Sequence, residues 1–166
     1  METLFYTTVP SPVGTLVVVA SSVGLRMIEF GDRPFPPANM RGVEWVESAE
    51  KTRRYTEQLG DYFAGSRTQF DFPLDLRGTD FQKSCWQALL DIPYGATCSY
   101  IGIARKVGRA RASRAVGQAN HHNPIPIVVP CHRVITSTGT LGGYGGGLDM
   151  KRALLDLEKR TTEHHG

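Results

Sequence analysis

The chain has 166 residues, of which 40% are apolar and 21% are charged, and its formal net charge is +3. These proportions are ordinary for a soluble globular protein, and no apolar run approaches the roughly 18 residues that a membrane-spanning helix needs. The N-terminus lacks a secretory pattern and the three cysteines are an odd number, so we expect a reducing cytoplasmic location rather than a disulfide framework.

The first half of the chain predicts a small antiparallel sheet followed by one helix. Residues 4–9, 14–20 and 25–30 are rich in β-branched and aromatic side chains and are separated by Ser- and Gly-containing turns. After a proline-rich loop, residues 46–64 carry an apolar helical stripe that ends at Gly65. We expect a domain boundary after this region, which gives domains 1–77 and 78–166.

The second half predicts short helices. Thr79 or Asp80 caps the first of them, and Ser99 caps the second, which Gly108 breaks. A third helix over residues 111–120 would bury apolar residues at i, i+3, i+4 and i+7 spacing, namely Ala112, Ala115, Val116 and Ala119. Two short helices around a glycine-containing turn are typical of a helix-turn-helix.

The sequence near the C-terminus predicts a last helix that has a buried apolar stripe with one acid at its edge. Met150, Ala153, Leu154 and Leu157 form the stripe, and Asp149 is the expected N-cap. Glu158 follows Leu154 by four residues, so it lies at the edge of this stripe.

Charge is unevenly distributed along the chain. No Asp or Glu occurs between Ile92 and Leu148, whereas this segment holds Arg105, Lys106, Arg109, Arg111, Arg114 and Arg133. Such a segment indicates a nucleic-acid partner, and a solvated basic face without a partner is the alternative. The third helix exposes small residues around Arg114, which suits the narrow minor groove or, alternatively, close helix packing.

The tetrapeptide Pro130-Cys131-His132-Arg133 ends an apolar run and sets a thiol beside an imidazole and a guanidinium. A free thiol has a pKa of about 8.5, and a neighbouring base or cation favours the nucleophilic thiolate. A small core cysteine is the alternative interpretation.

These residues resemble the O6-alkylguanine-DNA alkyltransferase family. The tetrapeptide continues into Val134 and follows Asn123-Pro124-Ile125-Pro126, and further family motifs occur in the same order at 92–95, 99–100, 114–117 and 142–147. The resemblance covers most of residues 78–158. It implies an α/β (α+β) fold with an N-terminal ribonuclease-H-like domain and a C-terminal winged helix-turn-helix domain that holds the chemistry.

The resemblance implies DNA repair by a single-use methyltransferase. Cys131 would take the alkyl group from O6 of a flipped guanine, and activity on O4-alkylthymine is a secondary expectation. His132 would accept the thiol proton and Glu158 would orient His132. Tyr100 would protonate the leaving base, and Asn123 would bond the backbone around the active-site turn.

The remaining roles also follow from the resemblance. Arg114 would fill the gap left by the flipped base, and the surrounding DNA surface would comprise Arg111, Ser113, Ala115, Gly117 and Gln118. The pocket would comprise Pro126, Val134, Tyr144 and Gly145. Neither a cofactor nor a metal is implied, since the chain has no Cys or His before Cys85. The expected partner is double-stranded DNA containing alkylated guanine, with no membrane, and the expected state is a monomer that could assemble cooperatively on DNA.

Two other functions remain open at this point. A turnover cysteine hydrolase could use Cys131, His132 and Glu158, although no sequence feature indicates an oxyanion hole. A non-catalytic, lesion-sensing DNA-binding protein is the second of these. Relatives of that type lack the reactive cysteine, whereas Cys131 is present here.

Overall fold

The computed structural model describes residues 1–165, and the side chains of residues 1–163. The chain divides into two compact units, Met1–Leu76 and Arg77–Gly166. This division falls between residues 76 and 77, next to the boundary expected from the sequence.

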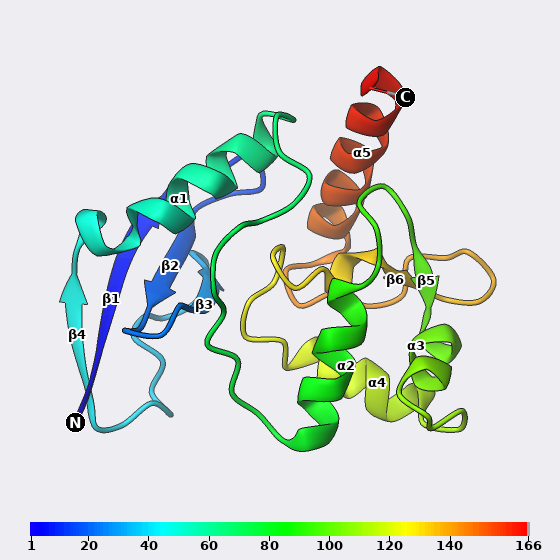
Figure 1. Ribbon diagram of the computed structural model, residues 1–166, viewed down its shortest axis with the longest axis horizontal. Helices are drawn as coiled ribbons and strands as arrows, with labels where there is room; N and C mark the ends of the chain where they lie inside the picture. The colour runs from blue at the N-terminus through cyan, green and yellow to red at the C-terminus, as the bar shows by residue number, and fades with distance from the viewer. Residues whose placement is uncertain (166) are drawn as a thin grey trace. The chain divides into compact units, whose positions relative to one another are not determined.

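The N-terminal unit is a four-stranded sheet with one helix (Figure 1). Its strands are β1 (Glu2–Val9), β2 (Leu16–Ala20), β3 (Leu25–Phe30) and β4 (Val43–Glu47), in the order β3-β2-β1-β4. Helix α1 (Ala49–Phe63) contacts β1 and β2, and it buries Tyr55, Leu59 and Tyr62. Leu4, Val17, Val19 and Met27 form a hydrophobic core cluster of the sheet.

Strand β4 was not predicted, and the expected helix therefore began too early. Residues 43–47 have the sequence Val-Glu-Trp-Val-Glu and pair in parallel with β1, with Trp45 opposite Leu4. The helix begins only after Ser48, whose hydroxyl accepts a hydrogen bond from the Lys51 N–H at 3.1 Å. The three predicted strands pair antiparallel, so the complete sheet is mixed.

The first three helices of the C-terminal unit occur in the order that the sequence predicts. Helix α2 (Asp80–Leu90) begins with a capping box at Thr79, and Ser99 caps α3 (Tyr100–Lys106). Helix α4 (Ser113–His121) begins two residues later than expected, which leaves Arg111 in the preceding turn. Val116 and Ala119 are buried as predicted, but Ala115 is exposed.

The rest of this unit carries the Cys131 segment and the last helix. A short 3-10 helix, η1 (Cys131–Arg133), leads into β6 (Val134–Ile135), which pairs in parallel with β5 (Cys98–Ser99). Helix α5 (Leu148–His165) then follows. Within residues 1–165, no helix combines the length and apolar character needed to cross a membrane.

The buried face of α5 differs from the predicted stripe. The residues that it buries are Lys151, Leu154, Glu158 and Thr161, whereas Ala153 is exposed. Asp149 lies in the first turn of the helix instead of capping it. Two buried ionisable side chains therefore point from α5 into the unit, and both belong to the site described next.

Candidate active site

Asn123 organises the turn that presents the cysteine. Its Nδ2 donates to the Val129 carbonyl at 2.8 Å, and its Oδ1 accepts from the Ile125 N–H at 3.0 Å. Within this turn, Ile127 has a φ of 76°, a conformation that a β-branched residue adopts only when its surroundings impose it. The bonds of Asn123 thus hold a strained backbone in place directly before Cys131.

The Cys131 thiol is largely buried, with 7% of the residue exposed. Burial raises the pKa of this thiol to about 11, although a hydrogen bond from Asn123 and the charge of Lys151 act in the opposite direction. The thiol is therefore protonated at neutral pH in the free protein, and it needs a base before it can act as a nucleophile.

His132, Glu158 and Arg133 form a buried charged network next to the thiol. His132 Nε2 lies 2.6 Å from Glu158 Oε2, and Arg133 binds both carboxylate oxygens, through Nε at 2.8 Å and Nη2 at 3.0 Å. Arg133 Nη1 also donates to the Ile92 carbonyl at 2.8 Å. Hydrogen bonds and charge from His132 and then Arg133 outweigh the burial of Glu158 and lower the pKa of its carboxyl to about 2.

This network leaves His132 neutral and oriented. An ionised Glu158 accepts a hydrogen bond from Nε2–H, which fixes the tautomer with a lone pair on Nδ1. Nδ1 is buried and makes no hydrogen bond to any described residue. Burial lowers the pKa of His132, while Glu158 acts to raise it. The imidazole is thus in the form that can accept a proton.

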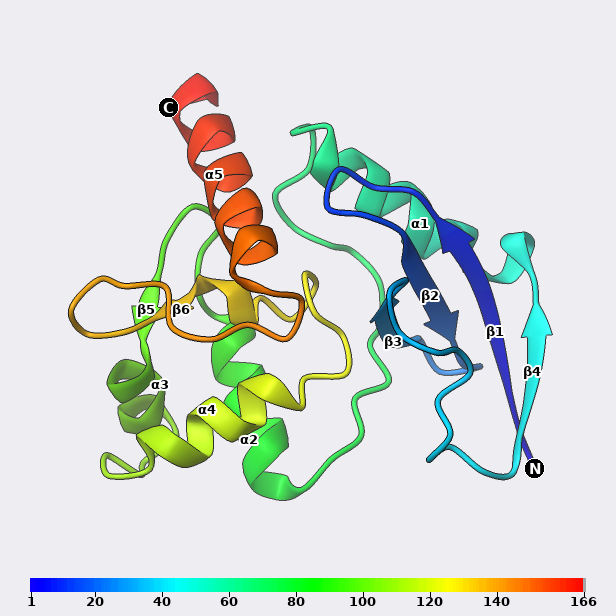
Figure 2. The ribbon, with the colours of Figure 1, turned by 180° about the vertical axis from the view of Figure 1, so that it is seen from behind.

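Lys151 is a buried residue of the site that the sequence did not reveal. No part of it is exposed, and its Nζ donates to the carbonyls of Val134 at 2.6 Å, Gly143 at 3.2 Å and Leu141. These carbonyls belong to β6 and to the loop of residues 136–147, which Figure 2 shows in orange between β6 and α5. Lys151 therefore ties this loop to the protein interior.

Replacing Lys151 by Met should loosen this loop. The carbonyls would lose a charged donor. We therefore expect the free energy of unfolding, measured in urea, to fall by about 3 kcal/mol. Hydrogen exchange in residues 136–147 should become faster. The exposed Lys159 on the same helix provides the control, because Lys159→Met should change neither quantity. Unchanged exchange of the loop in Lys151→Met would contradict the tethering role.

Tyr100 stands between this loop and α4. The Gly143 backbone hydrogen-bonds its phenol, and a Cβ on Gly142 would come within 2.8 Å of the phenol oxygen, so glycine permits this close approach. Burial raises the pKa of Tyr100, and the nearby Cys131 adds to this effect. The phenol therefore keeps its proton at neutral pH and can donate it.

A cavity of about 520 Å³ opens onto the thiol. Several predicted residues line it, while His132 and Glu158 lie behind Cys131 and outside the lining. Pro126 and Val134, which were expected in the pocket, are buried and do not line it. Asn120, His121 and Gly143 also line the cavity, and these three residues were not predicted from the sequence. The full lining comprises Tyr100, Ser113, Arg114, Gly117, Gln118, Asn120, His121, Cys131, Gly143, Tyr144 and Gly145.

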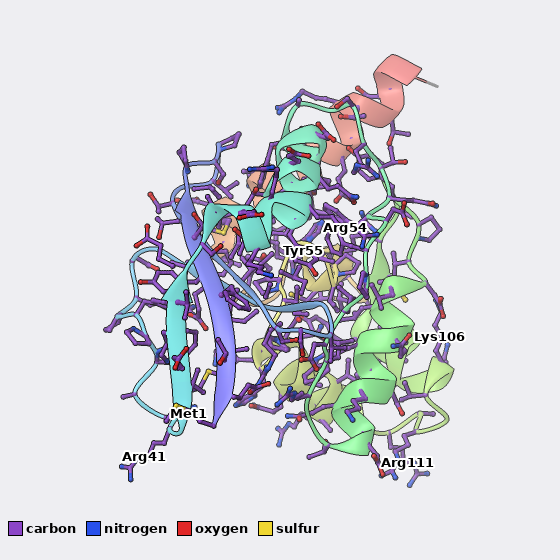
Figure 3. All side chains as sticks on the ribbon, turned by 60° about the vertical axis from the view of Figure 1, so that its left-hand side comes forward. Met1, Arg41, Arg54, Tyr55, Lys106 and Arg111 are labelled. Atoms are coloured by element: carbon purple, nitrogen blue, oxygen red, sulfur yellow. The ribbon has the colours of Figure 1, made fainter. Side chains whose placement is uncertain are left out.

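The cavity opens beside an exposed basic surface. Arg114 belongs to the lining and is exposed on α4, and Arg111 projects from the turn before this helix (Figure 3). The other exposed cations of this segment are Arg105, Lys106 and Arg109. Among the side chains that the structure describes, no three His, Cys, Asp or Glu residues gather as a candidate metal site.

A basic helix-turn-helix unit with a buried thiol, a neutral histidine and an adjoining cavity defines a DNA-binding protein with a nucleophilic cysteine. Comparison with known families agrees with this class. Residues 80–160 match the DNA-binding domain of 6-O-methylguanine DNA methyltransferase, and residues 4–76 match its ribonuclease-like domain. The chain belongs to the 6-O-methylguanine DNA methyltransferase family, as its motifs predicted.

Individual relatives extend over nearly the whole chain. A methylated-DNA–protein-cysteine methyltransferase of Mycolicibacterium paratuberculosis is 50% identical over 155 residues, which are 93% of this chain and 92% of the relative. A methylated-DNA–protein-cysteine methyltransferase of Methanosarcina acetivorans is 45% identical over 93% of this chain and 98% of the relative. Mycobacterium tuberculosis OGT, crystallised in complex with DNA, superposes with a TM-score of 0.85 at 46% identity. The superposition covers 96% of this chain and 94% of the M. tuberculosis chain. The predicted fold class is thereby confirmed.

Proposed function

We propose that this protein repairs DNA by moving the alkyl group of O6-alkylguanine onto Cys131, where it stays. The observation that carries this proposal is the buried thiol at the wall of a cavity large enough to admit a nucleobase, backed by a neutral histidine whose tautomer a carboxylate fixes. A thioether is not hydrolysed under mild conditions, so each molecule acts once.

The proposed transfer begins with a proton. The Cys131 thiol gives its proton to His132 Nδ1, directly or through a water, and the imidazolium is stabilised by Glu158. The sulfur then forms a bond to the alkyl carbon as the bond between that carbon and O6 breaks. The electron pair of the broken bond goes to the guanine, which leaves as an anion.

Tyr100 completes the proposed reaction. Its protonated phenol lines the cavity and can donate to the guanine ring, at N3 by the family resemblance. The resulting phenolate and the imidazolium return to their neutral forms through solvent. Guanine leaves unalkylated. In the net reaction the S–H bond of Cys131 and the bond between O6 and the alkyl carbon are replaced by an S–C bond on the protein and an N–H bond on the guanine.

Base flipping is required for this chemistry, because O6 of a stacked guanine cannot reach a buried sulfur. The DNA-bound relative from M. tuberculosis supports DNA as the partner. We place α4 in the minor groove, where its small surface at Ser113, Ala115, Gly117 and Gln118 fits and Arg114 enters the base stack. Arg111 would contact the phosphate backbone nearby.

Replacing Arg114 by Ala should therefore slow alkyl transfer from duplex DNA far more than transfer from a free base. We expect alkyl transfer from duplex DNA to slow by about a hundredfold, since unstacking a base costs a few kcal/mol. Transfer from free O6-benzylguanine should change little, because no stack has to be opened. The matched control is Arg41→Ala, which removes an exposed arginine from the N-terminal unit (Figure 3). Equal losses on both substrates would refute the role in flipping.

We assign the pocket walls to Tyr144 and Gly145, with Pro126 and Val134 supporting them from the interior. O4-alkylthymine is a second substrate to be tested. We propose that the protein acts as a monomer on cytoplasmic DNA, and that any cooperative assembly forms only on DNA.

Intact-mass measurement tests the proposed function. After mixing with a duplex containing O6-methylguanine, the protein should gain one methylene mass, located on the Cys131 peptide, at one per molecule. Product formation beyond one equivalent would instead indicate a turnover hydrolase. DNA binding without any mass gain would indicate a lesion sensor.

A further inference from the structure

Asn120 stands out in the cavity wall because its side-chain amide is unused. It lies in the last turn of α4, on the same side of the helix as Ser113 and Gly117, and it lines the cavity together with Cys131. Both Nδ2 and Oδ1 are buried, and neither hydrogen-bonds any described residue. A buried polar group left in this state costs about 1–3 kcal/mol, so it calls for an explanation.

The nearby Asn123 shows what a structural asparagine looks like in this unit. Its amide donates to the Val129 carbonyl and accepts from the Ile125 N–H, so both of its ends hold the active-site turn. Asn120 carries the same amide three residues earlier and contributes none of these bonds. A role in holding the fold therefore does not account for Asn120.

The backbone of Asn120 is fixed, so only its side chain can find a partner. The helix side opposite the cavity is buried through Val116 and Ala119, and Trp86 Nε1 donates to the Ala119 carbonyl at 2.9 Å. The Asn120 carbonyl itself accepts from the Asn123 N–H at 3.2 Å. The χ2 torsion of an asparagine has a broad range, which lets the amide turn without moving the helix.

We propose that Asn120 is a substrate-reading residue, whose amide hydrogen-bonds the nucleobase that enters the cavity. This inference rests on the proposed function. An amide offers one acceptor and two N–H donors, which match a base edge that carries both acceptors and a donor, as guanine does. No described residue pairs with this amide in the free protein, and the bound base would supply its partners. Binding of the base thereby recovers an interaction that the free protein lacks.

The test combines reaction rate with stability in Asn120→Leu, which keeps similar volume and removes the amide. We expect transfer to slow by about 10- to 100-fold on both an O6-methylguanine duplex and free O6-benzylguanine, the equivalent of one or two hydrogen bonds. The thermal midpoint of the free protein should rise, because an unpaired polar group is removed. Gln87→Leu, at an exposed position of α2, is the control and should change neither rate.

Each other outcome overturns the inference. An unchanged rate would show that the amide does not contact the base. A lower thermal midpoint would show that Asn120 supports the fold, and a loss confined to duplex DNA would make it a DNA contact instead. If the unsubstituted protein gained no alkyl group from either substrate, the proposed function itself would fail, which is a separate result.

Discussion

Replacing Cys131 by Ser should abolish alkyl transfer, lowering the rate by roughly ten-thousandfold or more. Serine preserves the shape of the site, but its hydroxyl is a far weaker nucleophile than a thiolate, and His132 cannot compensate for that difference. The mass of the variant should stay constant through long incubation with an O6-methylguanine duplex. Cys85→Ser provides the contrast, since that buried thiol lies on α2 and does not line the cavity, and it should still permit transfer to Cys131.

The pH dependence of the unsubstituted protein tests how the thiol is activated. With a thiol pKa of about 11, attack by a thiolate formed without a base would speed up about tenfold per pH unit between pH 7 and 9. Proton transfer to His132 predicts a nearly constant rate over that range instead. Because burial lowers the pKa of His132, the rate should fall only below the ordinary histidine range, as the imidazole becomes protonated. Single-turnover rates from pH 5 to 9 distinguish the two.

The sequence predicted the cap at Ser99 and the buried positions of α4 because these signals are local. A cysteine beside a histidine, a cap at Ser99 and the apolar spacing at Val116 and Ala119 each depend on neighbouring residues, and the structure places them accordingly. Strand β4 depends instead on pairing with β1, which is distant in the chain. Because the strand is short and directly precedes a helix, its last two residues were assigned to that helix.

Helix α5 shows why the charged part of the site was harder to predict. A lysine on an amphipathic helix is normally solvated, so periodicity assigned the buried stripe to apolar residues and placed Lys151 outside it. In the structure the carbonyls of the 136–147 loop and the network around His132 provide partners for Lys151 and Glu158, which turns the helix so that these residues are buried. Such partners come from a loop and a turn whose conformations no sequence pattern indicates. Glu158 was identified only through family resemblance.

Glu158→Gln is expected to be the most damaging substitution among the residues outside the cavity. It removes the only carboxylate bound to Arg133 and His132 in the part of the chain that the structure describes, and it turns an N–H group toward one of these donors. Breaking a buried ion pair in this way costs about 3–5 kcal/mol, which urea unfolding at pH 7.5 would reveal. Transfer should also slow by about a hundredfold, since the tautomer of His132 is no longer fixed.

The acid dependence of stability gives this prediction its sharpest test. The folded pKa of Glu158 is lowered to about 2, so its contribution is complete above its ordinary value of 4.5 and is lost as pH falls from there toward 2. In Glu158→Gln this loss between pH 4.5 and 2 should be absent, whereas the exposed Glu163→Gln should keep it. The folded pKa of His132 is also lowered, so stability should already decrease below pH 6.5 in the unsubstituted protein. An identical acid profile for Glu158→Gln and the unsubstituted protein would mean that the carboxylate is not what stabilises the network.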